Sequence, residues 1–218
     1  MEPIYKTVES LDWMTLVLFF SLLILTLGKY LFQSRFLNFM ILPFNNKYVV
    51  LYNKKGRLLN WFHILLTVFQ LINLSLFLFL VQKTFFPVSS EDYLYYFFLI
   101  TGWLLLFELV KMMLQLGKGF VFNTQGLVSD LLFNKTSYLN HSSLVMFVAN
   151  MVLVYIAKDS QIVIYAALVL IVSINIIGFF RLMKNHQKVI ISHFFYFILY
   201  LCTLEIAPLV IVGSYLKD

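Results

Sequence analysis

Cysteine and charged side chains are both scarce in this sequence. The single cysteine, Cys202, excludes an internal disulfide framework and a cysteine-based zinc site. Charged residues make up 12% of the 218 residues, about half the share found in soluble globular domains. Because so few charges cannot cover a water-facing surface, the composition excludes an ordinary soluble domain, a disordered tail and a collagen-like fibre.

Enzyme signatures are also missing. The sequence has no HExxH, no G-x-S-x-G, no glycine-rich dinucleotide loop and no carboxylate cluster suited to Mg²⁺. Of the four histidines, only His186 and His193 share a helical face, and they lie two turns apart, too far for one metal ion. We therefore expect a non-enzymatic protein with no catalytic residue, no metal site and no cofactor.

The sequence does contain long apolar stretches, and 61% of its residues are hydrophobic. A bilayer core about 30 Å thick needs roughly 20 apolar residues in a helix. Six stretches meet that length, at about 13–32, 58–81, 93–116, 138–157, 162–180 and 189–216. These runs predict an all-α membrane protein, a six-transmembrane-helix bundle forming a single domain over residues 1–218.

The first apolar stretch is too long for a signal-peptide core and has an acidic flank, Glu2, Glu9 and Asp12. We therefore expect it to be retained.

Twelve of the 16 Lys and Arg residues lie in or beside the first, third and fifth connections. The positive-inside rule then places these connections in the cytoplasm and both termini on the opposite side. The net charge of +6 indicates headgroup contacts here, not nucleic-acid binding.

The longest connection, the cytoplasmic loop 33–57, contains an apolar stretch, Phe36 to Phe44, that is too short to span and is broken by Pro43. We interpret the loop as an interfacial segment, with a docking surface for a cytoplasmic partner as the alternative. The connection 117–137 includes a fragment long enough for two helical turns. By contrast, 158–161 is short enough to make the fourth and fifth spans antiparallel neighbours.

Polar side chains inside the spans are the main functional candidates, because burying a charge in hydrocarbon is costly. Glu205 lies near the middle of the sixth span, and Pro208 is expected to kink that helix and free a backbone carbonyl. This pair is suited to binding a proton or a cation, to accepting a hydrogen bond from another helix, or to facing a partner subunit.

Two further polar stripes are predicted. Glu108 and Lys111 share a face of the third span and are close enough to pair, with Thr101 on the same stripe. The second stripe, in the second span, consists of His63, Thr67, Gln70 and Asn73. In the fourth and fifth spans, Asn150 and Asn175 are expected to form interhelical hydrogen bonds, and Gly178 to allow close packing. These stripes serve either to hold the bundle together or to form a proton or ion path.

The segment from Phe36 to Leu80, with its PFNNKY loop, and the late segment LYLCTLEIAP resemble an uncharacterised family of small polytopic inner-membrane proteins from Bacteroidota. The family signature Leu-Cys-Thr-Leu-Glu-Ile-x-Pro is matched by Leu201 to Pro208, whereas the proline usual in the family's fourth span is absent. The resemblance implies six spans and an inner-membrane location. It carries no activity, substrate or cofactor.

Two functional hypotheses follow, with a third further behind. The first is a non-enzymatic subunit or scaffold of a larger envelope assembly, with membrane lipids and other membrane-protein subunits as partners. By analogy with the machines of such bacteria, that assembly is one for protein secretion or gliding. The second is a small proton-coupled carrier or channel using Glu205, Glu108, Lys111 and His63. The third is a membrane enzyme acting on lipid.

Overall fold

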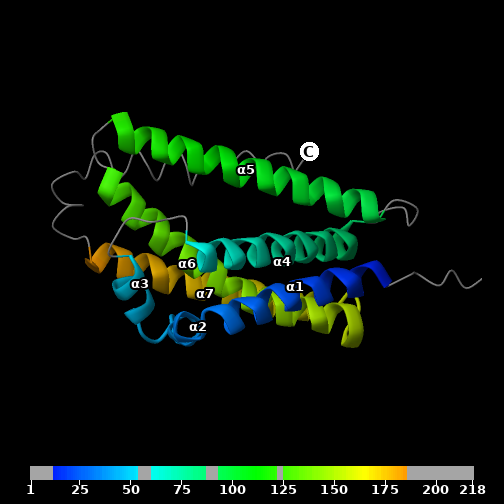
Figure 1. Cartoon of the computed structure of the whole chain (residues 1–218). Coiled ribbons are helices and arrows are strands. Elements are labelled where there is room, and N and C mark those ends of the chain that lie inside the picture. Colours follow the sequence, from blue (N-terminus) through cyan, green and yellow to red (C-terminus); the bar gives the residue numbers. More distant parts are fainter. Residues whose placement is uncertain (1–11, 54–59, 87–92, 122–124, 186–218) are drawn as a thin grey trace, which may run out of the picture. The chain divides into compact units, whose positions relative to one another are not determined.

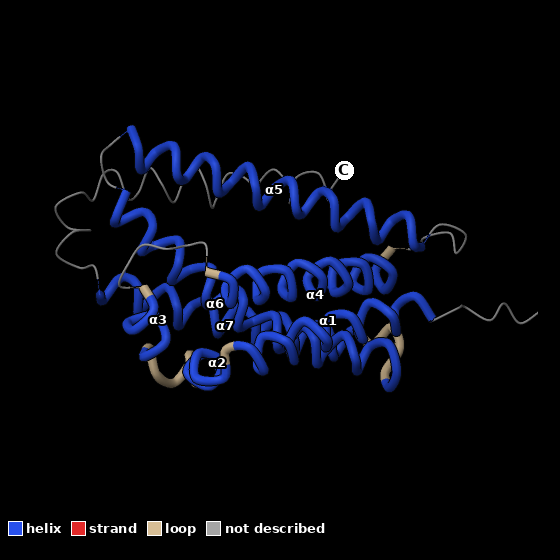
Figure 2. The backbone as a smooth tube through the Cα atoms, in the orientation of Figure 1, coloured by secondary structure: helices blue, strands red, loops and turns tan. Residues whose placement is uncertain are grey.

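The computed structural model describes residues 12–53, 60–86, 93–121 and 125–185. Throughout these ranges the ordered elements are helices, with no strand, which confirms the all-α prediction (Figures 1 and 2). The helices are α1 (Asp12–Leu31), α2 (Gln33–Met40), α3 (Lys47–Tyr52), α4 (Trp61–Phe85), α5 (Tyr93–Val121), α6 (Gln125–Met151) with a π-helical continuation η2 (Val152–Ile156), and α7 (Gln161–Asn185).

The chain forms two compact units, residues 1–178 and 179–218. In the second unit the described part is the last turns of α7. Five helices in the described ranges are long and apolar enough to cross a membrane, namely α1, α4, α5, α6 with η2, and α7. The sixth predicted span, 189–216, lies outside the described residues.

Hydroxyl side chains do not interrupt these helices, because they bond within their own helix. Thr67, Ser75, Thr84 and Thr101 each donate to the carbonyl four residues earlier, at 2.7–2.9 Å. A hydroxyl that bonds its own backbone needs no water, so these residues are compatible with an apolar environment.

Helix α4 is the central element of the first unit. It contacts α1, α5 and α6, and Figure 1 shows it between α1 and α5. Helices α4 and α6 run parallel, since the residues that meet rise in number together, with Phe69 against Phe147 and Asn73 bonded to Asn150. Helix α5 returns the chain between them and packs on both.

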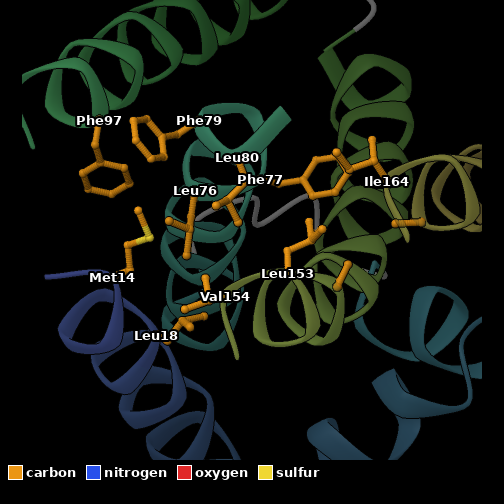
Figure 3. Close-up of a cluster of buried hydrophobic side chains, with 12 residues drawn as sticks. Met14, Leu18, Leu76, Phe77, Phe79, Leu80, Phe97, Leu153, Val154 and Ile164 are labelled. Atoms are coloured by element: carbon orange, nitrogen blue, oxygen red, sulfur yellow. The ribbon is translucent and has the colours of Figure 1, made fainter. Parts of the chain in front are cut away.

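One end of this unit is filled by an apolar cluster, which we call the upper cluster. It brings together residues from α1, α4, α5, α6, η2 and α7 (Figure 3). Its buried members are Met14, Leu18, Leu76, Phe77, Phe79, Leu80, Phe97, Ala149, Leu153, Val154, Ile164 and Ala167.

The described part of the loop, residues 33–53, packs on the opposite end of the unit. Helix α2 ends at Met40, shortly before Pro43, as expected from the missing amide hydrogen of proline. Buried residues of α2 and α3 join α4 and α6 in a second cluster, the lower cluster: Phe36, Phe39, Leu42, Tyr48, Val49, Phe62, Leu66, Phe133 and Tyr138. The predicted interfacial segment is therefore anchored to the bundle through its aromatic side chains.

The fourth long helix begins earlier than its predicted span. Helix α6 starts at Gln125, whereas the sequence predicts a span from about 138. The polar residues that suggested a connection are buried within the helix instead, and Ser137 donates to the carbonyl of Phe133 at 2.6 Å. The helix continues through them because they are packed inside the protein, and hydroxyl groups such as that of Ser137 bond to carbonyls of the same helix.

The short turn after η2 is confirmed. Asp159 adopts a left-handed backbone conformation with φ of 56°, which aspartate tolerates better than most residues. The turn reverses the chain, so α7 runs antiparallel to α6. Asn175 of α7 accordingly meets Ser142 of α6, while Ala149 and Ala167 share the upper cluster.

Close packing between α6 and α7 depends on Gly178. A Cβ atom at this position would lie 2.5 Å from Cγ of Tyr138, which the aromatic ring cannot accommodate without moving. We predict that Gly178→Ala lowers the free energy of unfolding by about 1–3 kcal/mol, measured by thermal denaturation in mild detergent. The control is Gly102→Ala, where nothing lies within 4 Å of the added atom. Equal stability of the two variants would contradict this packing.

Tyr48 gives the lower cluster a pH dependence. Burial raises the pKa of this phenol above its ordinary value of 10.0. In the unfolded chain the phenol ionises near pH 10, so its stabilising contribution is complete below that pH and is lost as the pH rises further. We predict that Tyr48→Phe makes the melting temperature fall less steeply above pH 10 than in the wild type. Tyr30→Phe, which changes an exposed phenol, should leave the profile unchanged.

Candidate functional site

Helices α4 and α6 carry many buried polar side chains. Those of α4 include His63, Gln70 and Asn73, and those of α6 include Asn134, Ser137, Asn140, His141, Ser142, Ser143 and Asn150. The predicted stripe of α4 meets polar residues of α6 across the interface between the two helices.

Asn73 and Asn150 lie at its inner end, and both are fully buried. The Asn150 amide nitrogen donates to the backbone carbonyl of Asn73 at 3.0 Å, linking the two helices. The Asn73 amide nitrogen donates to the carbonyl of Phe69 at 2.8 Å within its own helix. The interhelical bond predicted for Asn150 is confirmed, with a backbone carbonyl as the acceptor.

Six residues before Asn73 on α4, Thr67 forms a second link between α4 and α6. Its hydroxyl donates to the carbonyl of His63 at 2.9 Å and accepts from the amide nitrogen of Asn140 at 3.4 Å. On the other side of α6, the amide nitrogen of Asn175 in α7 approaches the hydroxyl of Ser142 at 3.5 Å. Polar contacts thus connect α6 to α4 and to α7, which agrees with the prediction for Asn175.

The two buried histidines of α4 and α6 are packed against aromatic rings. His63 stacks on Phe133 with ring centroids 5.0 Å apart and an interplanar angle of 23°. His141 meets Phe39 edge to face, with centroids 5.3 Å apart, and also bonds to the backbone of Phe39. Both rings are therefore fixed by the lower cluster.

The stripe of α5 reaches the same region. The amide nitrogen of Gln70 donates to the Glu108 carboxylate at 3.1 Å, so the two predicted stripes meet here. Lys111 acts electrostatically on Glu108, and its ammonium group lies 5.7 Å from the centre of the Phe107 ring. Both Glu108 and Lys111 are half-buried, whereas Gln70 is buried.

The remaining candidates, Glu205 and Pro208, lie outside the described residues. Among the described residues no group of three or more His, Cys, Asp or Glu side chains is placed to hold a metal ion. The polar groups present are amides, hydroxyls and imidazoles around one carboxylate. Such groups are suited to hydrogen bonding between helices and to binding small polar species.

Several buried polar residues of α6 were not expected from the sequence. Asn134 and Ser137 were assigned to a connection, and Asn140 and His141 were not among the polar residues expected to link the helices. Their spacing of three and four residues does follow one helical face. That periodicity was the available signal, and the glycine-rich and charged residues before it obscured the start of the helix.

The Gln70–Glu108 bond can be tested by exchange. Gln70→Glu alone would place two carboxylates in contact, and we predict a loss of about 1–3 kcal/mol in unfolding free energy. Adding Glu108→Gln restores one carboxylate and one amide, so the double variant should recover most of that stability. Thermal unfolding in mild detergent measures both. A double variant no more stable than Gln70→Glu would show that the two side chains do not pair.

A family model described as a domain of unknown function, DUF4271, matches residues 14–216, leaving out the first 13 and the last two of the 218 residues. No curated protein and no solved structure matches the chain significantly. The expected resemblance to an uncharacterised family is thereby confirmed. The chain belongs to the DUF4271 family, a domain of unknown function.

Proposed function

We propose that this protein crosses a bacterial inner membrane several times and serves as a non-enzymatic subunit of a larger envelope assembly. We further propose that it binds its partner along the flank of α5 that carries Glu108 and Lys111. Five long apolar helices support the membrane placement. The partner we expect is a membrane helix with a polar or charged side chain at the depth of Glu108.

The observation that carries the proposal is the contrast between α5 and α4. In its apolar stretch 6% of the residues of α5 are buried within the described structure, against 56% in α4. Lipid tails satisfy exposed leucine and phenylalanine side chains, but they do not satisfy a carboxylate. Ionisable side chains in a membrane helix normally face protein or water, so the half-buried Glu108 on α5 favours a protein neighbour.

The arrangement of the connections supports the proposed orientation, with both termini periplasmic. Helix α3, from the first connection, packs against α6, whose first turns lie within the third predicted connection, 117–137. At the other end, near the turn at 158–161, the hydroxyl of Tyr155 donates a hydrogen bond to the hydroxyl of Thr15 at 3.0 Å. Thr15 lies near the start of α1. Connections assigned to one side of the membrane therefore gather at one end of the first unit.

The carrier alternative is favoured by a separate observation, the buried polar residues of α4 and α6 that reach Glu108 through Gln70. It requires transport, so it predicts a pH-dependent flux in proteoliposomes that is lost in Glu205→Gln. The subunit hypothesis requires no flux. Protein secretion and gliding are two settings in which an assembly of the proposed kind would act.

The subunit hypothesis is tested by extracting the tagged protein from native membranes and weighing the intact complexes by native mass spectrometry. We predict a species heavier than the 25.7 kDa chain. We also predict that Glu108→Gln lowers recovery of the partner about tenfold, equivalent to about 1.4 kcal/mol. The glutamine oxygen can still accept from Gln70, so the fold should be retained.

Asp12→Asn is the matched control, because it removes a carboxylate charge from an exposed position at the start of α1. It should leave partner recovery unchanged. A bare chain in the wild-type preparation, or equal recovery of the partner with Glu108→Gln, would contradict the proposal. A second copy of this chain as the partner would support it and identify a homo-oligomer.

A further inference from the structure

Helix α2 has a buried apolar face and, beside it, an exposed one. Phe36 and Phe39 are buried in the lower cluster. The exposed apolar side chains follow one another at spacings of one, three and four residues, which keeps them on one side of the helix. We call these residues the apolar stripe: Leu37, Met40, Ile41 and Phe44. Its last member is 88% exposed, more than any other large hydrophobic residue in the described ranges.

A third face of α2 is polar. The amide nitrogen of Asn38 donates to the carbonyl of Ser34 at 2.9 Å, so this side chain lies along its own helix. Asn38 and Met40 are two residues apart, about 200° around the helix axis, and therefore point to nearly opposite sides. Arg35 fastens the helix to the start of α4, because its guanidinium donates to the side-chain oxygen of Asn60 at 2.6 Å. Helix α2 is thus amphipathic and is also fixed to the bundle.

The position of α2 suits the surface of a bilayer. Helix α1 has 20 residues and is about 30 Å long, which matches the thickness of the hydrocarbon core. At Phe32, where φ is −135° and ψ is 50°, the chain changes direction. Figure 2 shows α2 end-on, whereas α1 is seen from the side. In the proposed membrane setting, α2 therefore begins where the hydrocarbon ends and runs along the membrane surface.

The charge of this segment indicates what covers the apolar stripe. The sequence contains no Asp or Glu from Trp13 to Ser90. Lys29, near the end of α1, and Lys47, at the start of α3, are exposed on either side of the stripe in the sequence. Cations beside an exposed apolar surface complement anionic headgroups above acyl chains. A soluble partner would also cover the stripe, but a surface at the hydrocarbon boundary already meets lipid.

From this geometry we infer that α2 and the turn to Phe44 form an in-plane anchor that binds anionic phospholipid. The apolar stripe enters the acyl chains, Lys29 and Lys47 attract the phosphate groups, and Asn38 faces water. Because the buried face of α2 belongs to the lower cluster, the anchor holds that end of α4 and α6 at the membrane surface. The inference rests on the membrane placement in the proposed function, and not on a partner along α5.

Nitroxide labels test the depth of the anchor in nanodiscs of phosphatidylcholine and phosphatidylglycerol. Each label is attached to one introduced cysteine, Met40→Cys, Asn38→Cys or Leu23→Cys, in the full chain with Cys202→Ser. Its collisions with oxygen, which dissolves in lipid, and with an aqueous nickel chelate report its surroundings. Leu23 is exposed near the middle of α1 and serves as the membrane reference. We predict lipid surroundings at Met40 and Leu23, and nickel accessibility several-fold higher at Asn38 than at Met40.

The reference label separates two kinds of failure. A label at Met40 that is as accessible to nickel as the label at Asn38, with Leu23 in lipid, would overturn the anchor alone and would favour a soluble partner on the apolar stripe. Nickel accessibility at Leu23 would contradict the membrane placement itself and overturn both proposals.

The headgroup preference is measured by titrating the protein in mild detergent with phosphatidylglycerol or phosphatidylcholine and detecting bound lipid by native mass spectrometry. We predict tighter binding of phosphatidylglycerol. Combining Lys29→Gln with Lys47→Gln should weaken it at least about fivefold, equivalent to about 1 kcal/mol, and leave phosphatidylcholine binding unchanged. Lys158→Gln, which removes an exposed cation from the turn at 158–161, is the matched control and should have no effect. Equal affinity of the wild type for both lipids, or unchanged phosphatidylglycerol binding in the double variant, would overturn the inference.

Discussion

Helices that lie in lipid gain little from the hydrophobic effect when they associate, because lipid tails are as apolar as leucine. In the proposed membrane setting, the described helices of this chain are held together by polar contacts at their centre. The bond from Asn150 to the carbonyl of Asn73 ties α6 to α4, and the contact between Asn140 and Thr67 repeats the link one level lower. Because α1 and α5 also pack on α4, their placement depends on the pairing of α4 with α6.

Apolar and polar contacts occupy different positions along the interface between α4 and α6. The upper cluster and the lower cluster supply area and shape, with aromatic rings meeting mainly edge to face. The amide contacts of Asn150 and Asn140 with α4 lie between them and supply direction, because an amide bonds only to certain neighbours. Shape alone would allow α4 and α6 to slide along each other by a turn. The amide contacts at Asn73 and Thr67 select one register, and Gly178 against Tyr138 selects another between α6 and α7.

Much of this arrangement could be predicted from residue patterns, and what could not has physical reasons. Apolar runs of about 20 residues predicted the long helices because helix length and bilayer thickness are both fixed. The polar stripe of α4 was predicted from its spacing, but its partner on α6 was not. Asn134 and Asn140 follow glycines and charges that are typical of a connection. Only packing against α4 and the lower cluster makes a continuous helix favourable there, and packing is not visible in a local pattern.

The parallel arrangement of α4 and α6 also sets an order for biosynthesis. Helix α4 ends at Phe85 and its polar partner is complete only at Met151, 66 residues later. At roughly 5–20 residues per second, the ribosome needs about 3–13 s to supply it. During that interval the amides of α4 lack their neighbours, and α5 has to run back along α4 before they meet. In the proposed membrane setting, the insertion machinery or a chaperone beside it has to shelter this half-finished interface.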